Sequence, residues 1–316
     1  MAARKVPLYV IGGLVSLLVL YFASLQIPVA GLLLSVLMPL PIALTSDRVG
    51  WWGGLVVVLV ALAILVYLEQ VAGFKAEMLP VVHMAVLGLT LAFLAPRPYP
   101  LEIVVGGAAL LAMLFQVSVF FVLAQQQGLT LLAYLERTMT EGWTGVMQLL
   151  DKDQTLEQQL YLLGLSLADL ISLVSQLTPA FLLINNTLVA WLTYLLGRKF
   201  GAPRGWATPV VTLSRWEAPA WLIFVLIGAG FLLLVPYRPP QMVAVNILLV
   251  CLLLYFFQGL AILAFNFQRF QVPRFLRWIT YLLLILVKPA MLVVVLLGLI
   301  DLWLDFRRLH PPPSEA

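Results

Sequence analysis

The sequence has 316 residues, of which 63% are hydrophobic and 10% are charged. Soluble domains average roughly 45–50% apolar and about 25% charged residues, so the composition excludes an ordinary soluble protein and indicates an integral membrane protein. The net charge of +4 is explained by basic loops on one side of a membrane, and the sequence predicts no nucleic-acid binding.

Nine apolar runs are candidates for spanning helices, which need about 17–25 mostly apolar residues. The runs are residues 8–25, 29–44, 51–68, 78–95, 101–124, 176–196, 218–235, 241–265 and 278–300. The second run is short and contains prolines, so we predict eight or nine spans. The fold expected is all-α: a polytopic transmembrane helix bundle that forms a single membrane domain over residues 1–316.

The second run is interrupted by Pro39 and Pro41 and is followed by polar residues at 45–48. Proline lacks a backbone donor and frees the carbonyl four residues earlier. In lipid such a carbonyl needs a partner from a neighbouring helix or a lined cavity. We therefore predict a helix break at Pro39 and Pro41, with residues 35–41 facing protein, and a cytoplasmic turn at 45–48.

Residues 125–175 are more polar than the other segments, and their apolar side chains recur mostly at steps of three and four residues. This spacing is typical of amphipathic helices. Thr155 and Gln158 have the spacing of a capping box at the start of the second helix. We predict an amphipathic helical hairpin outside the membrane. It either lies on the membrane or caps the bundle, or it serves as a lid or docking surface for a partner.

Several polar side chains lie inside the predicted spans, where such groups are costly and usually face the bundle interior. They are His83, Gln116, Asn185, Asn186, Asn246, Gln258 and Lys288. The amides either bridge helices or bind a ligand, and His83 is either a packing residue or a proton or ligand site. Lys288 lies deep in its run, before Pro289, and needs a carboxylate, several carbonyls or an anionic ligand.

Lysine and arginine fall mostly in the loops that are cytoplasmic if the N-terminus is cytoplasmic, and the positive-inside rule predicts that orientation. The polar tail at 301–316 disagrees, because nine spans place its two arginines outside. No GxSxG, HExxH, Walker or dinucleotide-binding motif is present, so we expect no enzyme, no cofactor and no metal site. Any ATP-driven step then needs partner proteins.

Three stretches together resemble the YybS family of bacterial membrane proteins, a family classed as a domain of unknown function. They are LMPLPIALTSDRVGWWGGLVV at 37–57, QGLAILAFNFQRFQVPRFLRWI at 258–279, and LLGLIDLWLDFRRL at 296–309, which contains a G-x-x-D-x-x-x-D-x-R pattern. The YybS family is distantly similar to the S components of energy-coupling-factor vitamin transporters and to the cell-shape protein MreD. The resemblance implies a multi-pass protein of the bacterial cytoplasmic (inner) membrane, with short, broken early helices and a pocket between helices.

Two functions fit these features. The first is an S-component-like subunit that binds or transports a polar or anionic small molecule together with ATPase or other membrane-protein partners. Its candidate ligand-binding residues are Lys288, Asn185, Asn186, Gln258, His83 and Asn246. The second is a non-catalytic scaffold subunit of a bacterial envelope complex in the lipid bilayer, in which the hairpin and the tail are docking surfaces and the buried polar residues hold helices together.

Overall fold

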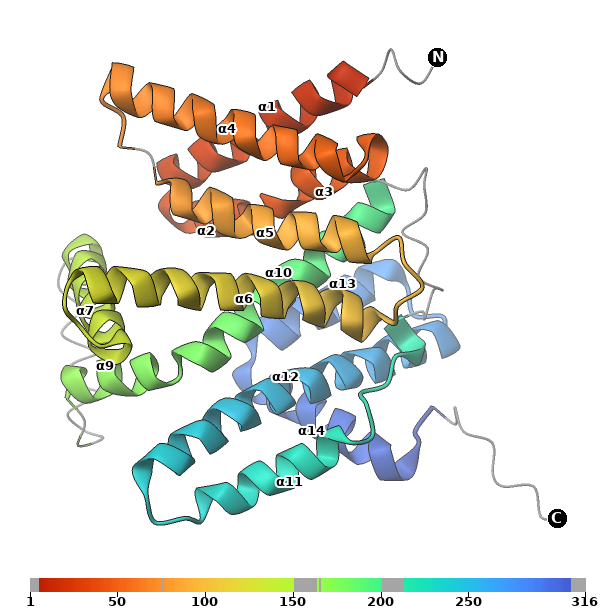
Figure 1. Ribbon diagram of the computed structural model, residues 1–316. Helices are drawn as coiled ribbons and strands as arrows, with labels where there is room; N and C mark the ends of the chain where they lie inside the picture. The colour runs from red at the N-terminus through yellow and green to blue at the C-terminus, as the bar shows by residue number, and fades with distance from the viewer. Residues whose placement is uncertain (1–5, 76, 151–163, 165, 201–212, 308–316) are drawn as a thin grey trace. The chain divides into compact units, whose positions relative to one another are not determined.

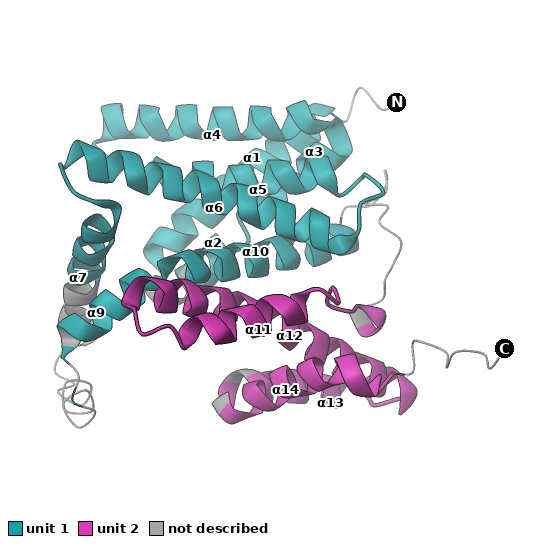
Figure 2. Ribbon diagram, turned by 60° about the horizontal axis from the view of Figure 1, so that its bottom comes forward, with its two compact units in different colours: residues 1–208 teal, residues 209–316 magenta. Residues whose placement is uncertain are grey.

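The computed structural model describes residues 6–75, 77–150, 164, 166–200 and 213–307, which form helices and no strand (Figure 1). The all-α fold class is therefore confirmed for the described residues. The chain, which we predicted to form one domain, groups into two compact units, residues 1–208 and 209–316 (Figure 2). Each unit has its own set of helix–helix contacts.

Nine helices belong to the described part of the first unit and four, with one short 3₁₀ turn, to that of the second. The first unit contains α1 (Val6–Gln26), α2 (Pro28–Ser35), α3 (Pro39–Val49), α4 (Trp51–Ala72), α5 (Met78–Leu94), α6 (Leu101–Gln126), α7 (Leu131–Leu150), α9 (Leu167–Gln176) and α10 (Thr178–Phe200). The second contains η2 (Leu213–Arg215), α11 (Leu222–Leu233), α12 (Arg238–Arg269), α13 (Arg274–Leu286) and α14 (Lys288–Leu304).

Five described helices are long and apolar enough to cross a membrane, namely α1, α4, α6, α10 and α12. The count reaches six if α13 and α14, which meet at a bend of 104°, form one broken span. The predicted eight or nine spans are not confirmed. Helices α5 and α11 are apolar but shorter, and the predicted run 29–44 consists of two short helices.

The helix break at the two prolines is present, but its backbone chemistry differs from our prediction. Pro39 and Pro41 lie in the first turn of α3, where a backbone N–H has no intrahelical acceptor in any case. The Ser35 carbonyl accepts from the Met38 N–H, and the Leu37 carbonyl accepts from the Leu40 N–H, both at 3.1 Å. Tight local turns, rather than neighbouring helices, therefore satisfy these carbonyls.

The predicted cytoplasmic turn at 45–48 is wrong, because α3 continues to Val49. Thr45, Ser46 and Asp47 are buried within the unit, and the Thr45 hydroxyl donates to the Pro41 carbonyl at 2.8 Å. The start of α3 is also packed against protein, since Met38, Pro39 and Pro41 are buried, while Ser35, Val36, Leu37 and Leu40 are partly exposed.

Helix α3 lies at the centre of the first unit, in contact with α1, α4, α5 and α10. Glycines on three of these helices make room for it. A Cβ at Gly13 would collide with the Thr45 side chain, one at Gly54 with the Ser46 hydroxyl, and one at Gly88 with the α3 backbone. Small residues of this kind let helices approach closely where lipid offers no hydrophobic driving force.

The predicted amphipathic hairpin contains α7 and α9, which lie side by side at one end of α6 and α10 (Figure 1). The Ser172 hydroxyl donates to the Glu136 carboxylate at 3.2 Å and joins the two helices. A capping box starts α9: the Ser166 hydroxyl accepts from the Asp169 N–H, and the Asp169 carboxylate accepts from the Ser166 N–H. The capping box predicted at 155–158 lies outside the described residues.

The predicted run 278–300 is not one helix. Helix α13 ends at Leu286, Val287 is extended, and α14 begins at Lys288 with Pro289 in its first turn. A proline is well placed in a first helical turn and is poorly tolerated in a helix interior, which explains where the break falls. Lys288 therefore starts a helix instead of lying in mid-helix, and its side chain lies outside the described residues.

Candidate functional site

Three polar side chains, two of them buried and one partly buried, belong to the contacting helices α5, α6 and α10. His83 lies on α5, Gln116 on α6 and Asn186 on α10, and these three helices contact one another pairwise. His83 is nearly buried and Asn186 is completely buried. The Asn186 amide interacts with the His83 imidazole, although the pair falls short of the geometry of a well-formed hydrogen bond.

Four polar atoms of this cluster make no well-formed hydrogen bond to the described residues. His83 Nε2, Gln116 Oε1 and both amide atoms of Asn186 are buried without a hydrogen bond. A buried, unsatisfied polar group costs about 1–3 kcal/mol, and native proteins contain only a few of them. Several such atoms in one place therefore indicate a site that something else completes.

A cavity of about 250 Å³ opens beside two of these side chains. His83 and Gln116 supply its polar groups, and the rest of its lining is apolar, with Leu79, Pro80, Phe115, Val119 and Phe120. No charged side chain is among these lining residues. The apolar walls with a few convergent polar groups are typical of small-molecule sites, although the volume lies just below the usual range of about 300–1,000 Å³.

The cluster lies at one depth in the first unit. His83, Asn186 and Gln116 are about 8–15 Å from the start of α5, the start of α10 and the end of α6, at 1.5 Å per residue. These three helix ends lie at the same end of the unit (Figure 1).

Other predicted site residues have different surroundings. Asn185 is exposed, because neighbours on a helix point about 100° apart and only one of the two asparagines can face the interior. The Asn246 amide donates to the Met242 carbonyl of its own helix at 2.8 Å. Gln258 belongs to a network in the second unit. The structure does not describe the side chain of Lys288 and so does not bring it to any of these groups.

The network around Gln258 is centred on the ion pair of Asp301 and Arg307. Arg307 Nη2 lies 2.7 Å from Asp301 Oδ2, and both side chains are almost completely buried. The Gln258 amide donates to the same carboxylate oxygen at 3.1 Å, and the Phe306 N–H donates to the other at 3.0 Å. Arg307 also donates to the Ser214 and Trp216 carbonyls.

Sequence reasoning missed this network, since it assigned residues 301–316 to a polar tail. Asp301 lies in the last turn of α14. Arg307 returns to it because Asp305, just after the helix, adopts a left-handed conformation with φ of 38°. The first and last residues of the D-x-x-x-D-x-R part of the pattern thus form the ion pair. Its hydrogen bonds are nearly all made within the chain, so the network holds α12, α14 and the 214–218 segment together and leaves little for a ligand.

Among the described residues, no group of three or more His, Cys, Asp or Glu side chains is placed to hold a metal ion. The polar cluster on α5, α6 and α10 is therefore the candidate site. It offers N–H donors and oxygen or nitrogen acceptors, and it lacks an adjacent nucleophile and base pair among the described side chains.

No curated protein and no solved structure matches the sequence significantly. The model of one family, described as "Predicted membrane protein (DUF2232)", matches residues 14–302. The match extends over both units and agrees with the several apolar helices. The YybS name and the similarity to S components and MreD stay predictions. The chain belongs to the DUF2232 family of predicted membrane proteins, a family whose function is unknown.

Proposed function

We propose that this membrane protein binds a small, uncharged polar molecule between α5, α6 and α10 and acts as a binding subunit for partner proteins, as an S component does. The observation that carries the proposal is the set of unsatisfied polar atoms on His83, Gln116 and Asn186 beside a cavity. A ligand that hydrogen-bonds to these atoms removes a penalty that packing alone leaves in place.

The lining indicates the chemistry of the ligand. His83 and Gln116 offer both donors and acceptors, and the described lining contains no lysine, arginine, aspartate or glutamate. Phe115 and Phe120 add aromatic surface on the same wall. An uncharged molecule with a polar edge and a flat or apolar body fits these groups better than the anionic ligand that Lys288 had suggested.

The distribution of charge supports an outward-facing site in the cytoplasmic membrane of a bacterium. The Arg48 guanidinium donates to the Phe200 carbonyl at 3.1 Å, which brings the ends of α3 and α10 together. Arg48, Arg198 and Lys199 therefore gather at the end of the unit opposite to the start of α5. The positive-inside rule assigns that basic end, and with it the N-terminus, to the cytoplasm. The cluster then lies nearer to the outer side of the membrane.

Untargeted mass spectrometry of small molecules released from the purified protein tests the proposal. We expect one compound to co-purify with the natural protein and to be lost from Gln116→Leu and Asn186→Leu. Asn185→Leu is the matched control, because it places the same new side chain one residue away, on the exposed face, and retains the compound. Absence of any retained compound from the natural protein, or its retention by both cluster variants, contradicts the proposal.

The hairpin favours a second candidate function, that of a scaffold subunit. Leu132 on α7 and Leu173 on α9 remain more than 40% exposed although the two helices pack together. We expect a docked partner protein to cover them. Native co-purification decides between the two functions: a stoichiometric partner that is lost on deletion of 129–170, with no small molecule retained, favours the scaffold.

A further inference from the structure

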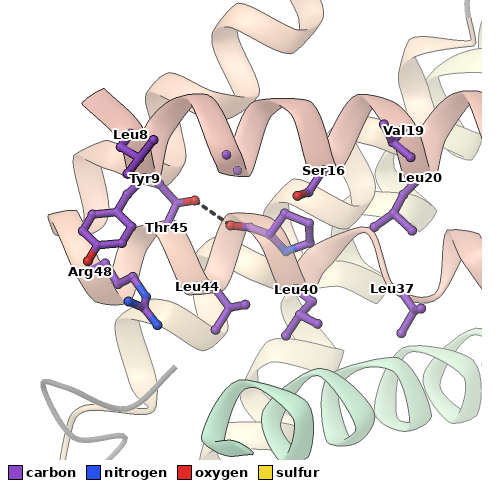
Figure 3. Close-up of a pocket in the computed structure, with 13 residues that line it drawn as sticks. Leu8, Tyr9, Ser16, Val19, Leu20, Leu37, Leu40, Leu44, Thr45 and Arg48 are labelled. Atoms are coloured by element: carbon purple, nitrogen blue, oxygen red, sulfur yellow. Dashed lines mark hydrogen bonds between the residues drawn. The ribbon is translucent and has the colours of Figure 1, made fainter. Parts of the chain in front are cut away.

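An apolar groove runs between α1 and α3 on the first unit, away from the α5–α6–α10 cavity. Its volume is about 570 Å³, and apolar side chains, five of them leucines, form most of its walls (Figure 3). Gly12 and Gly13 on α1 provide a floor without side chains, and the Ser16 hydroxyl is the polar group near the middle. Arg48 and Tyr9 stand together at one end of the groove in Figure 3.

Arg48 is placed to bind an anion at the end of the groove where it stands beside Tyr9, which we call the mouth of the groove. Its guanidinium lies 5.0 Å from the centre of the Tyr9 ring and donates one hydrogen bond, to the Phe200 carbonyl. Arginine has five N–H donors, so most of its donors stay available. None of the ion pairs among the described residues involves Arg48, and the neighbouring α10 terminus adds the positive charges of Arg198 and Lys199.

The mouth also has the features of a membrane interface. Trp51 and Trp52 lie three and four residues after Arg48, at the start of α4, and Trp52 is largely exposed. Tryptophans favour the level of the lipid headgroups. From Tyr9 to Leu20 the groove follows α1 for about 16 Å, which is roughly half of the ~30 Å hydrocarbon core. The groove thus has the depth of one leaflet.

We propose that this groove binds one acyl chain of an anionic phospholipid whose phosphate lies against Arg48. A phosphate pairs with the planar guanidinium through two parallel hydrogen bonds, and Arg198 and Lys199 strengthen the local preference for negative charge. The chain then lies on Gly12 and Gly13 between the leucines of α1 and α3. The lipid also links α1 to α3, and α3 is too short to span the membrane alone.

Native mass spectrometry of delipidated protein, titrated with dioleoyl phosphatidylglycerol or dioleoyl phosphatidylcholine, tests this proposal because the two lipids have the same chains. We expect one phosphatidylglycerol per chain to be retained in preference to phosphatidylcholine. Arg48→Met is expected to lower that preference by about fivefold or more, as the loss of one cation at a membrane surface predicts.

Gly12→Leu places a side chain in the groove at a position where the added Cβ meets no atom within 4 Å. We expect it to abolish retention of this lipid. Gly106→Leu on α6 is the matched control, since its Cβ is equally unobstructed, and it retains the lipid. The proposal is overturned if the natural protein retains both lipids equally or if Gly12→Leu retains the lipid unchanged. It is also overturned if the natural protein is a dimer that Gly12→Leu dissociates and Gly106→Leu does not, because a second copy of the chain then occupies the groove.

Discussion

Neutralising Asp301 by the substitution Asp301→Asn is expected to destabilise the second unit by about 3–5 kcal/mol, the usual cost of breaking a buried ion pair. The variant keeps the volume of the side chain but removes the charge that faces Arg307 at 2.7 Å. Asp301 Oδ2 accepts from both Arg307 and Gln258. Both bonds end on the ionised carboxylate, and hydrogen bonds to charged groups contribute about 1.5–3 kcal/mol each.

The assay is the free energy of unfolding in mixed detergent micelles, followed by tryptophan fluorescence. The double variant Asp301→Asn/Arg307→Met leaves no unpaired charge, so we expect it to recover most of the loss. The coupling energy between the two positions is then about 3 kcal/mol. Glu217→Gln is the control: its carboxylate lies 3.5 Å from Arg307 and is partly exposed, so its loss costs less than about 1 kcal/mol.

The reasoning is refuted if the two single losses simply add in the double variant. Additive losses mean that Asp301 and Arg307 do not stabilise each other, in spite of their distance. The same conclusion follows if Asp301→Asn and Glu217→Gln have equal effects.

Three further outcomes are expected. Gly298→Ala places a methyl group against the α12 backbone and costs about 1–3 kcal/mol, whereas Gly228→Ala on α11 meets open space and is neutral or slightly stabilising in the same unfolding assay. Without ligand, Asn186→Leu raises the melting temperature, because it removes about 1–3 kcal/mol of unsatisfied amide, and Asn185→Leu leaves it unchanged. Ser166→Ala removes a helix cap worth about 0.5–2 kcal/mol and speeds amide hydrogen exchange in the first turn of α9.

Composition alone predicts a helical membrane protein, because an apolar fraction of 63% cannot be hidden from water in any soluble fold. The positions of Pro39 and Pro41 predict the break before α3, because proline is poorly tolerated in a helix interior and is well placed in a first turn. Span counting by hydropathy is less successful, because it does not distinguish a helix that crosses lipid from a short one that is surrounded by protein. Helix α3 shows the difference, since it contains buried Ser46 and Asp47 and is packed on several sides.

The candidate site was only partly predictable. Polarity within an apolar run singles out His83, Gln116 and Asn186, but it singles out Asn185 and Asn246 equally. Neighbouring residues on a helix point about 100° apart, so Asn186 can be told from Asn185 only when it is known which face of α10 is packed against protein. The Asp301 and Arg307 pair escapes any rule of helical spacing, because it depends on a left-handed turn at Asp305, a conformation that sequence patterns associate with glycine.

The short helices α2 and α3 also bear on how the chain enters the membrane. With 8 and 11 residues, neither reaches the length of about 17–25 that the insertion machinery recognises as a span, and α3 ends with a charged pair, Asp47 and Arg48. These helices therefore depend on partners that are already inserted: α2 on α1, and α3 above all on the glycines of α1, α4 and α5. We expect them to be integrated late in biogenesis. A bulky residue at Gly13 then lowers the yield of inserted protein in the cell, before any loss of stability can be measured on purified material.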